Sequence, residues 1–320
     1  MKKAFATLSH NMLCEIAITP DVLSMQCDNL HPDVHDICLR QLKDFLVEAA
    51  IVRDLRDGEW SHFMSSEKPN LPLRAKELLK KLKQIHLRRV PAASPSKPAS
   101  DLEWCKEAIG SARENPGLTG IITLESTIQA LTDQESSHQE EMLAAMNKVP
   151  SAQWWPQTKS AIRLHRRTGE YLKHLALTLE CSTHVAFIDP NINPSKRGYD
   201  RFLELILRAN NEAIIEIHRG LFDGNGSQKR KMDREIFGEW NTVLRKHDRK
   251  VEVCLWPEIH DRYLITNLVG ILVPYGFDNE QHENMPKTTW CRLPRAIRDE
   301  VELGFDPQKA SDEFSLGNPN

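Results

Sequence analysis

Three apolar runs decide the fold class: THVAFIDP (183–190), AIIEIHRG (213–220) and KVEVCLWP (250–257). Each has the length and the β-branched content of a buried strand. The residues between them carry helical apolar spacing, in GYDRFLELILRAN (198–210) and in KMDREIFGEWNTVLRKHD (231–248). Strands that alternate with helices at these lengths predict an α/β sheet with right-handed crossovers.

Shorter strand-like runs follow in quick succession, namely HDRYLIT (260–266), GILVPYG (270–276) and TTWCRLP (288–294). These closing runs predict that the sheet is mixed and not purely parallel. A helical stretch at 159–181 leads into the first buried strand. We therefore expect an α/β domain over residues 151–320, with a mixed sheet flanked by helices.

The first half of the chain, residues 1–150, has a different pattern. It predicts a mainly helical domain with one or two short strands, of which MLCEIAITPDVL (12–23) is the clearest. A Pro- and Ala-rich stretch at 90–100 reads as a loop. Helical patterns cover four stretches: 33–52, 73–88, 101–114 and 132–150.

Charge is nearly balanced over the whole chain, with 42 Lys and Arg against 45 Asp and Glu, and a formal net charge of −3. This balance excludes a general polycation, so any contact with nucleic acid must come from a local patch. Residues 151–250 hold 18 basic and 12 acidic side chains, whereas 251–320 hold 6 and 12. The basic stretch indicates an anion-binding surface or, alternatively, solvated helix faces.

The sequence also bears on compartment and cofactors. No apolar run approaches the roughly 18 residues of a membrane helix, and polar residues interrupt the start of the chain, which argues against a signal peptide. The seven cysteines are scattered and never spaced as CxxC. We expect no disulfide framework, no metal, no cofactor and a cytoplasmic location.

The motif that carries chemistry is PEIHDRYLITN (257–267), followed by GFDN (276–279). On a strand, His260 and Arg262 are two residues apart and would project from one face. An arginine fork neutralises two oxygens of a phosphate diester, and a neutral imidazole near physiological pH attacks phosphorus or moves a proton. This pairing predicts a phosphate-ester site.

Residues 183–279 resemble one half of the phospholipase D superfamily, whose signature is His-x-Lys-x4-Asp with a Gly-Ser-x-Asn turn on the next strand. His260, Arg262 and Asn267 fall on the three signature positions. Gly276 and Asn279 fall on the outer residues of the turn, two positions later than usual. The local sequence is more similar still to that of the phospholipase D-like module at the C-terminus of MIT-domain proteins.

The resemblance implies metal-free phosphodiester cleavage, with His260 as nucleophile, Arg262 binding phosphate and a second histidine as general acid. Only one motif is present, so two chains would have to share a site across a two-fold axis as a homodimer. Three departures matter. Arg262 replaces lysine, Phe277 replaces serine, and Asn267 lacks the negative charge that would stabilise a charged histidine. The MIT-associated modules, by contrast, bind membranes.

Three functions follow as hypotheses. The first is a metal-independent nuclease or phosphodiesterase of a bacterial defence or mobile-element system, with nucleic acid as its partner. The second, which is the alternative to it, is an inactive binding or scaffold module for nucleic acid, membrane phosphoinositide or other protein subunits. A structural reading, in which Asp261 or Glu258 holds Arg262, also stands. The third hypothesis places metal-dependent chemistry on N-terminal carboxylates: Asp21, Glu48, Asp54, Asp57 and Glu125.

Supporting residues complete the candidate site. Asp189 ends a strand where α/β sheets bind ligands, although Asp-Pro-Asn is also turn chemistry. His218 and Arg219 end the next strand and could add phosphate contacts, as could Asn279. A basic cluster beside a glycine-rich loop could follow a nucleic-acid backbone: Lys229, Arg230, Lys231 and Arg234. Trp154 and Trp155 are interpreted as packing one domain against the other.

Overall fold

A computed structural model describes residues 12–24, 30–68, 71–133, 140–152, 154–155, 160–221, 234–279 and 287–317. The chain divides into two compact units. Unit 1 holds the described residues of Leu13–Thr158, and unit 2 holds those of Lys159–Asn320 together with Met12. The sequence placed the division between residues 150 and 151, and the observed division falls between 158 and 159.

Sheet A, the sheet of unit 1, has five parallel strands in the order β3-β2-β1-β4-β5. Their bounds are β1 Cys14–Ile18, β2 Ala50–Asp54, β3 Leu87–Arg89, β4 Leu118–Thr123 and β5 Leu143–Ala145. The expectation of one or two short strands is therefore wrong. Strand β2 follows a helix without a break, so the helical apolar spacing at 33–52 hides it, and β3 and β5 are only three residues long.

The helical elements of unit 1 are η1 Pro20–Leu23, α1 Pro32–Ala49, α2 Leu55–Ser66, α3 Leu73–Ile85, α4 Asp101–Glu114, α5 Glu125–Thr132, η3 Glu140–Met142 and η4 Met146–Ser151. Helix α4 begins at a capping box. The Ser100 hydroxyl accepts from the Glu103 backbone N–H at 3.3 Å, and the Glu103 carboxylate accepts from the Ser100 N–H at 3.1 Å. This reciprocal pair satisfies backbone donors that the first helical turn leaves free.

A buried ion pair joins two strands in the core of sheet A. Glu15 on β1 and Arg53 on β2 have fully buried side chains, and the guanidinium donates to both carboxylate oxygens, at 2.9 and 2.7 Å. Trp154 lies against Gly120 on β4, where a Cβ would overlap the indole ring. Trp155 packs on Phe45, with ring centroids 4.6 Å apart. Both tryptophans therefore have packing partners within unit 1, and the interpretation that they join two domains stays a prediction.

Sheet B, the sheet of unit 2, has eight strands in the order β13-β9-β8-β7-β10-β11-β12-β6. Strands β9, β8 and β7 are parallel to one another, and the remaining pairings are antiparallel, which confirms the predicted mixed α/β sheet. The bounds are β6 Ala161–Leu164, β7 His184–Ile188, β8 Ile214–Gly220, β9 Val251–Trp256, β10 Tyr263–Thr266, β11 Gly270–Leu272, β12 Thr288–Arg292 and β13 Asp312–Leu316.

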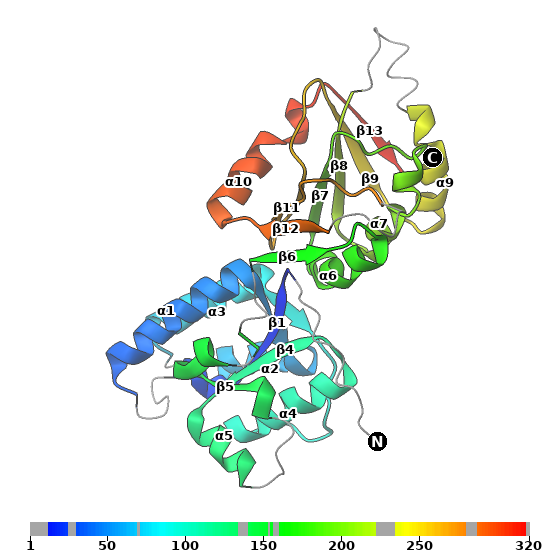
Figure 1. Ribbon diagram of the computed structural model, residues 1–320. Coiled ribbons are helices and arrows are strands. Elements are labelled where there is room, and N and C mark those ends of the chain that lie inside the picture. Colours follow the sequence, from blue (N-terminus) through cyan, green and yellow to red (C-terminus); the bar gives the residue numbers. More distant parts are fainter. Residues whose placement is uncertain are drawn as a thin grey trace. The chain divides into compact units, whose positions relative to one another are not determined.

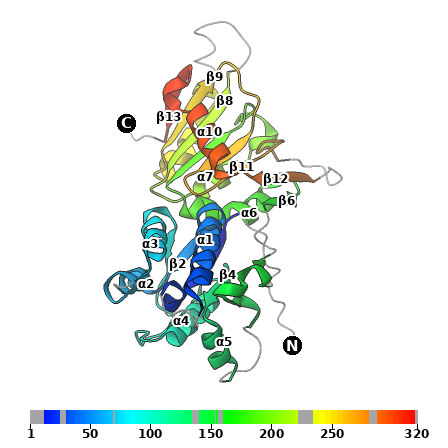
Figure 2. The same cartoon turned by 90° about the vertical axis from the view of Figure 1, so that its left-hand side faces the viewer.

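Helices cover both faces of sheet B (Figures 1 and 2). Helix α10 lies on one face, and α6, α7 and α9 lie on the other, where Phe202 stacks on Trp240 with centroids 5.4 Å apart. The bounds are α6 Thr168–Cys181, η6 Arg197–Tyr199, α7 Leu203–Arg208, α9 Gly238–Lys246, α10 Arg295–Gly304 and η7 Pro307–Lys309. None of the described helices is both long and apolar enough to cross a bilayer.

Candidate functional site

His260 and Arg262 lie before strand β10, because that strand begins only at Tyr263. The prediction that they share one face of a strand is therefore wrong. Strands β9 and β10 are separated in sheet B by β8 and β7, a span of about 14 Å at ~4.8 Å per strand. Residues 257–262 cross this span along the carboxyl ends of the parallel strands. Such a segment runs across the strands, so it cannot form hydrogen bonds with them as a further strand of sheet B.

Arg262 is held from the protein side. Its Nε lies 3.6 Å from Asp189 Oδ1, and its Nη1 donates to the Pro274 carbonyl at 3.3 Å. About 28% of the side chain remains exposed. The structural reading named Asp261 or Glu258 as its holder, but the carboxylate beside it is Asp189, from the end of β7.

Asp189 is fully buried and organises this end of the sheet. Its carboxylate accepts from the Tyr199 hydroxyl at 2.9 Å, from the Phe277 N–H at 3.0 Å and from the Asn191 N–H at 2.9 Å. Burial raises the pKa of this carboxyl, and the hydrogen bonds and Arg262 only partly oppose that shift. Asp189 therefore joins the loop after β7 to the turn at 276–277.

Asn267 lies at the opposite end of β10 from Arg262, roughly 15 Å away along the strand. Its side-chain oxygen accepts from the backbone N–H groups of Thr183 and His184, at 2.9 and 3.3 Å. Asn279 likewise has local partners, since its side-chain oxygen accepts from the Thr168 hydroxyl at 2.8 Å. The structure therefore brings Arg262, Asp189 and the 276–277 turn together but leaves Asn267 apart.

Exposed polar residues lie on the segments that contact Asp189 and the 276–279 turn. His260 is exposed, and its imidazole makes no hydrogen bond or ion pair with the residues that the structure describes. Lys196 and Arg197 are exposed in the loop after β7, which meets the 276–279 turn where the Asn279 N–H donates to the Gly198 carbonyl at 2.6 Å. The sequence reasoning missed Lys196 and Arg197, although basic residues after the Asn-Pro turn were a usable signal.

The predicted nucleic-acid patch lies mostly outside the described residues, since Lys229, Arg230 and Lys231 fall in the undescribed stretch 222–233. Arg234 is described and exposed, with its guanidinium carbon 5.7 Å from the centre of the Phe314 ring.

His218 and Arg219 point to opposite faces of sheet B, as neighbours on a strand must. Arg219 is buried with its guanidinium carbon 5.9 Å from the centre of the Phe237 ring. His218 is buried on the face that α10 covers, where its Nε2 lies 3.0 Å from Glu216 Oε2. Trp256 donates to its Nδ1 at 3.1 Å, so both ring nitrogens of His218 have partners within unit 2.

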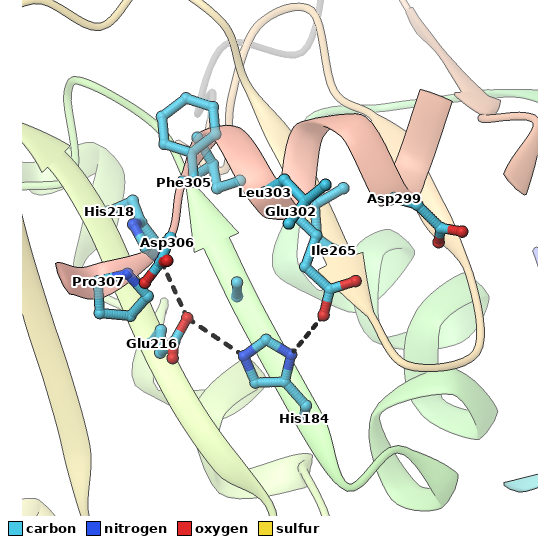
Figure 3. Close-up of a pocket in the computed structure, with 12 residues that line it drawn as sticks. His184, Glu216, His218, Ile265, Asp299, Glu302, Leu303, Phe305, Asp306 and Pro307 are labelled. Carbon is cyan, nitrogen blue, oxygen red and sulfur yellow. Dashed lines mark hydrogen bonds and ion pairs between the residues drawn. The ribbon is translucent and has the colours of Figure 1, made fainter. Parts of the chain in front are cut away.

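A cavity of about 490 Å³ lies between this face of sheet B and α10 (Figure 3). On its floor, His184 Nε2 lies 3.2 Å from Glu216 Oε2, and His184 Nδ1 lies 3.6 Å from Glu302 Oε1 on α10. The bond with Glu216 raises the pKa of His184 more than burial lowers it. Burial alone would raise the pKa of Glu216, but the two histidines lower it to about 2. The sequence reasoning missed this cluster, although Glu and His inside an apolar strand were the signal.

The N-terminal carboxylates do not form a metal site. Asp21 pairs with Lys68 at 2.6 Å, and Glu125 pairs with Lys148 at 2.7 Å. Asp54 accepts from the Ser61 N–H at 2.9 Å, while Glu48 and Asp57 are exposed. Across the described ranges, no group of three or more His, Cys, Asp or Glu side chains is arranged to hold a metal ion.

A buried carboxylate that the sequence reasoning did not single out, Asp101, lies where the strand order of sheet A reverses, beside the ends of β1 and β4. It accepts from the hydroxyls of Thr19 and Thr127, each at 2.9 Å, and from that of Thr123 at 3.0 Å. The Asp21 N–H also donates to it, at 2.9 Å. Its oxygens are therefore used within the fold.

Comparisons with known proteins do not assign a family. No protein-family model and no curated protein matches the chain. A solved structure of TrmBL2, described as an archaeal chromatin protein with a novel mode of DNA binding, aligns with 12% identity over 92% of this chain and 98% of that one. Its TM-score is 0.29, so the likeness carries no argument about this chain.

Proposed function

We propose that unit 2 binds a single-stranded nucleic acid along the carboxyl edge of sheet B. The observation that carries the proposal is the position of Arg262. A buried carboxylate and a carbonyl hold one side of its guanidinium, while its Nη2 makes no hydrogen bond with the described residues. A fork held in this way is oriented before a phosphate arrives, so little side-chain entropy is lost on binding.

Neighbouring residues extend this anion-binding surface. Lys196, Arg197 and His260 are exposed and make no ion pair with a described residue. We call these three residues and Arg262 the edge cluster. Exposed cations on adjoining loops suit a polyanion, because each neutralised phosphate releases a condensed counterion.

Tyr275 favours nucleic acid over a lipid headgroup. It follows Pro274, the residue that holds Arg262, and is 61% exposed. The Arg166 guanidinium carbon lies 5.3 Å from the centre of its ring. An exposed aromatic ring beside cations provides a stacking surface for a base, which single-stranded nucleic acid supplies and a phosphoinositide lacks.

Binding of a fluorescent 20-nucleotide DNA strand in EDTA, followed by anisotropy at several salt concentrations, tests this proposal. The double variant K196Q/R197Q is expected to reduce the slope of log affinity against log salt by roughly 1.4, at ~0.7 per lost phosphate contact. Tyr275→Ala is expected to weaken binding about fivefold or more through lost stacking.

Lys250→Gln is the matched control, because Lys250 precedes β9 at the amino end of the sheet, and it should change neither quantity. Equal losses in all three variants would contradict the assignment to this edge. Binding to phosphoinositide vesicles, with none to DNA or RNA, would favour the membrane alternative instead.

Metal-independent phosphodiester cleavage is a second candidate, and the exposed imidazole of His260, two residues from Arg262, favours it. In such a step the imidazole attacks phosphorus, and the leaving oxygen takes a proton from a second imidazole. Within unit 2, His218 is buried in another cluster, so a second copy of the chain would supply that group. Cleavage in EDTA that His260→Ala abolishes would support this candidate, and cleavage that survives the substitution would exclude it.

A further inference from the structure

The cavity under α10 is separate from the edge cluster. Its floor is formed by residues at alternate positions of β7 and β8, and its roof by α10 and the turn that follows (Figure 3). The edge cluster instead lies at the ends of these strands. A volume of about 490 Å³ falls within the range of small-molecule sites.

The charged groups that line the cavity are mainly acidic. Four carboxylates line it, namely Glu216, Asp299, Glu302 and Asp306. His184 lies between Glu216 and Glu302, with its Nε2 3.2 Å from the first and its Nδ1 3.6 Å from the second. His218 offers a ligand no unused nitrogen, because the Trp256 N–H donates to its Nδ1 and its Nε2 lies 3.0 Å from Glu216. Arg298 and Arg295 pair with Asp299, so the excess of negative charge comes from the other three carboxylates, and it repels phosphates and other anions.

Several acceptor oxygens in this lining remain unused. The Oε2 of Glu216 lies beside the imidazoles of His184 and His218. The Oε1 of Glu302 lies beside His184, and the Oδ1 of Asp306 accepts from the Gln308 N–H. The other oxygen of each of these carboxylates accepts no hydrogen bond from the part of the chain that the structure describes. These oxygens can accept from N–H donors of a ligand.

The rest of the lining is apolar. Ala186, Ile188 and Ile265 form the floor between the charged groups, and Phe305 and Leu303 stand opposite. Leu303 lines the cavity and is nevertheless 68% exposed, so an apolar group bound there would cover it. Apolar walls with a few polar groups are typical of sites for small organic ligands.

We propose that this cavity binds a small organic cation, an amine or guanidine carried on a compact apolar body. The cationic nitrogen donates to the unused oxygens of Glu216, Glu302 and Asp306. The apolar body lies against Leu303 and Ile188. This inference uses none of the residues that carry the proposed nucleic-acid site, so either can fail alone.

Titration calorimetry of the full chain tests the proposal with three probes of one shape. They are 2-phenylethylamine, 2-phenylethanol and 3-phenylpropionate, which are cationic, neutral and anionic at neutral pH. We expect saturable binding of the amine at about 1 mM or tighter, weaker binding of the alcohol, and none of the carboxylate. An alcohol that binds as tightly as the amine, or an amine that does not saturate, would overturn the proposal.

Variants on α10 locate the site. Glu302→Gln removes one lining charge and is expected to weaken amine binding about fivefold, and Leu303→Arg places a competing cation at the mouth and should abolish it. Both side chains are partly exposed, so the fold should tolerate the changes. Glu300→Gln, on the same helix but exposed and outside the lining, is the matched control and should bind normally. Equal effects of E302Q and E300Q would place binding elsewhere.

Discussion

Asp189 shows how one buried side chain determines the local geometry of the candidate site. It accepts three hydrogen bonds and lies beside the Arg262 guanidinium. A carboxylate satisfied in this way holds a position and does not act as a base. In a sequence, Asp-Pro-Asn fits both roles, so the function of Asp189 depends on its contacts in the folded chain.

Gly276 is required by this arrangement, and its replacement is expected to be costly. Its φ is +74°, and a Cβ would overlap the Asp189 carboxylate. Gly276→Ala should therefore lower the free energy of unfolding by about 2 kcal/mol or more, through backbone strain and overpacking. Chemical denaturation measures this loss. Gly238→Ala is the control, since nothing lies within 4 Å of a Cβ there and its free energy of unfolding should change by less than about 1 kcal/mol.

At the scale of elements, His184 connects three of them, because it lies on β7 between Glu216 of β8 and Glu302 of α10. Its folded pKa lies above the usual 6.5, so its stabilisation is complete below about pH 6.5 and is lost as the pH rises through the raised value. The pKa of Glu216 is lowered from 4.5 to about 2, so its stabilisation is present above about pH 4.5 and is lost as the pH falls towards 2.

The cluster is therefore expected to stabilise unit 2 most between about pH 4.5 and 6.5. Thermal unfolding across pH should show the largest difference between the native chain and His184→Gln in this window, with a smaller difference towards pH 8. His247→Gln, at an exposed histidine, should show no such dependence. A His184→Gln difference that is constant across pH would contradict the ion-pair description.

The sequence predicted elements where hydrophobic pattern and length agreed. Strands β7, β8 and β9 were expected because each is a buried run between helical patterns. Strand β2 was missed because AIVRD continues from α1 with no turn residue between them. The sequence also suggested that His260 and Arg262 belong to β10. Side-chain alternation does not show where a strand begins, so it cannot distinguish a strand residue from one that runs across the ends of the strands.

Residues of the α10 cavity were missed for a related reason. Glu216 and His218 alternate on a strand that is buried on both faces, so no exposed polar stripe distinguishes them. Trp256, the partner of His218, lies 38 residues away in sequence, and only the strand order places the two together. A polar pair inside an apolar strand predicts that partners exist but does not identify them.

At the scale of the whole molecule, the cleavage candidate depends on two copies of the chain. If each active site uses His260 from both copies, mixing native chain with an equal amount of His260→Ala should leave about one quarter of the activity, provided that the copies exchange at random. Independent sites would retain one half. Activity in EDTA after mixing and re-equilibration distinguishes these values, and chains kept separate until the assay are the control.

The short outer strands of sheet A affect how the chain behaves at high concentration. Strands β3 and β5 form its two borders and have three residues each, and β3 carries Arg88 and Arg89. A border this short exposes few unpaired backbone groups, and on β3 the exposed Arg89 adds a charge that opposes pairing with a like border. Parallel sheets form slowly, so their strands are exposed to aggregation while the chain folds. We therefore expect these short borders to limit pairing of sheet A with a strand of another chain.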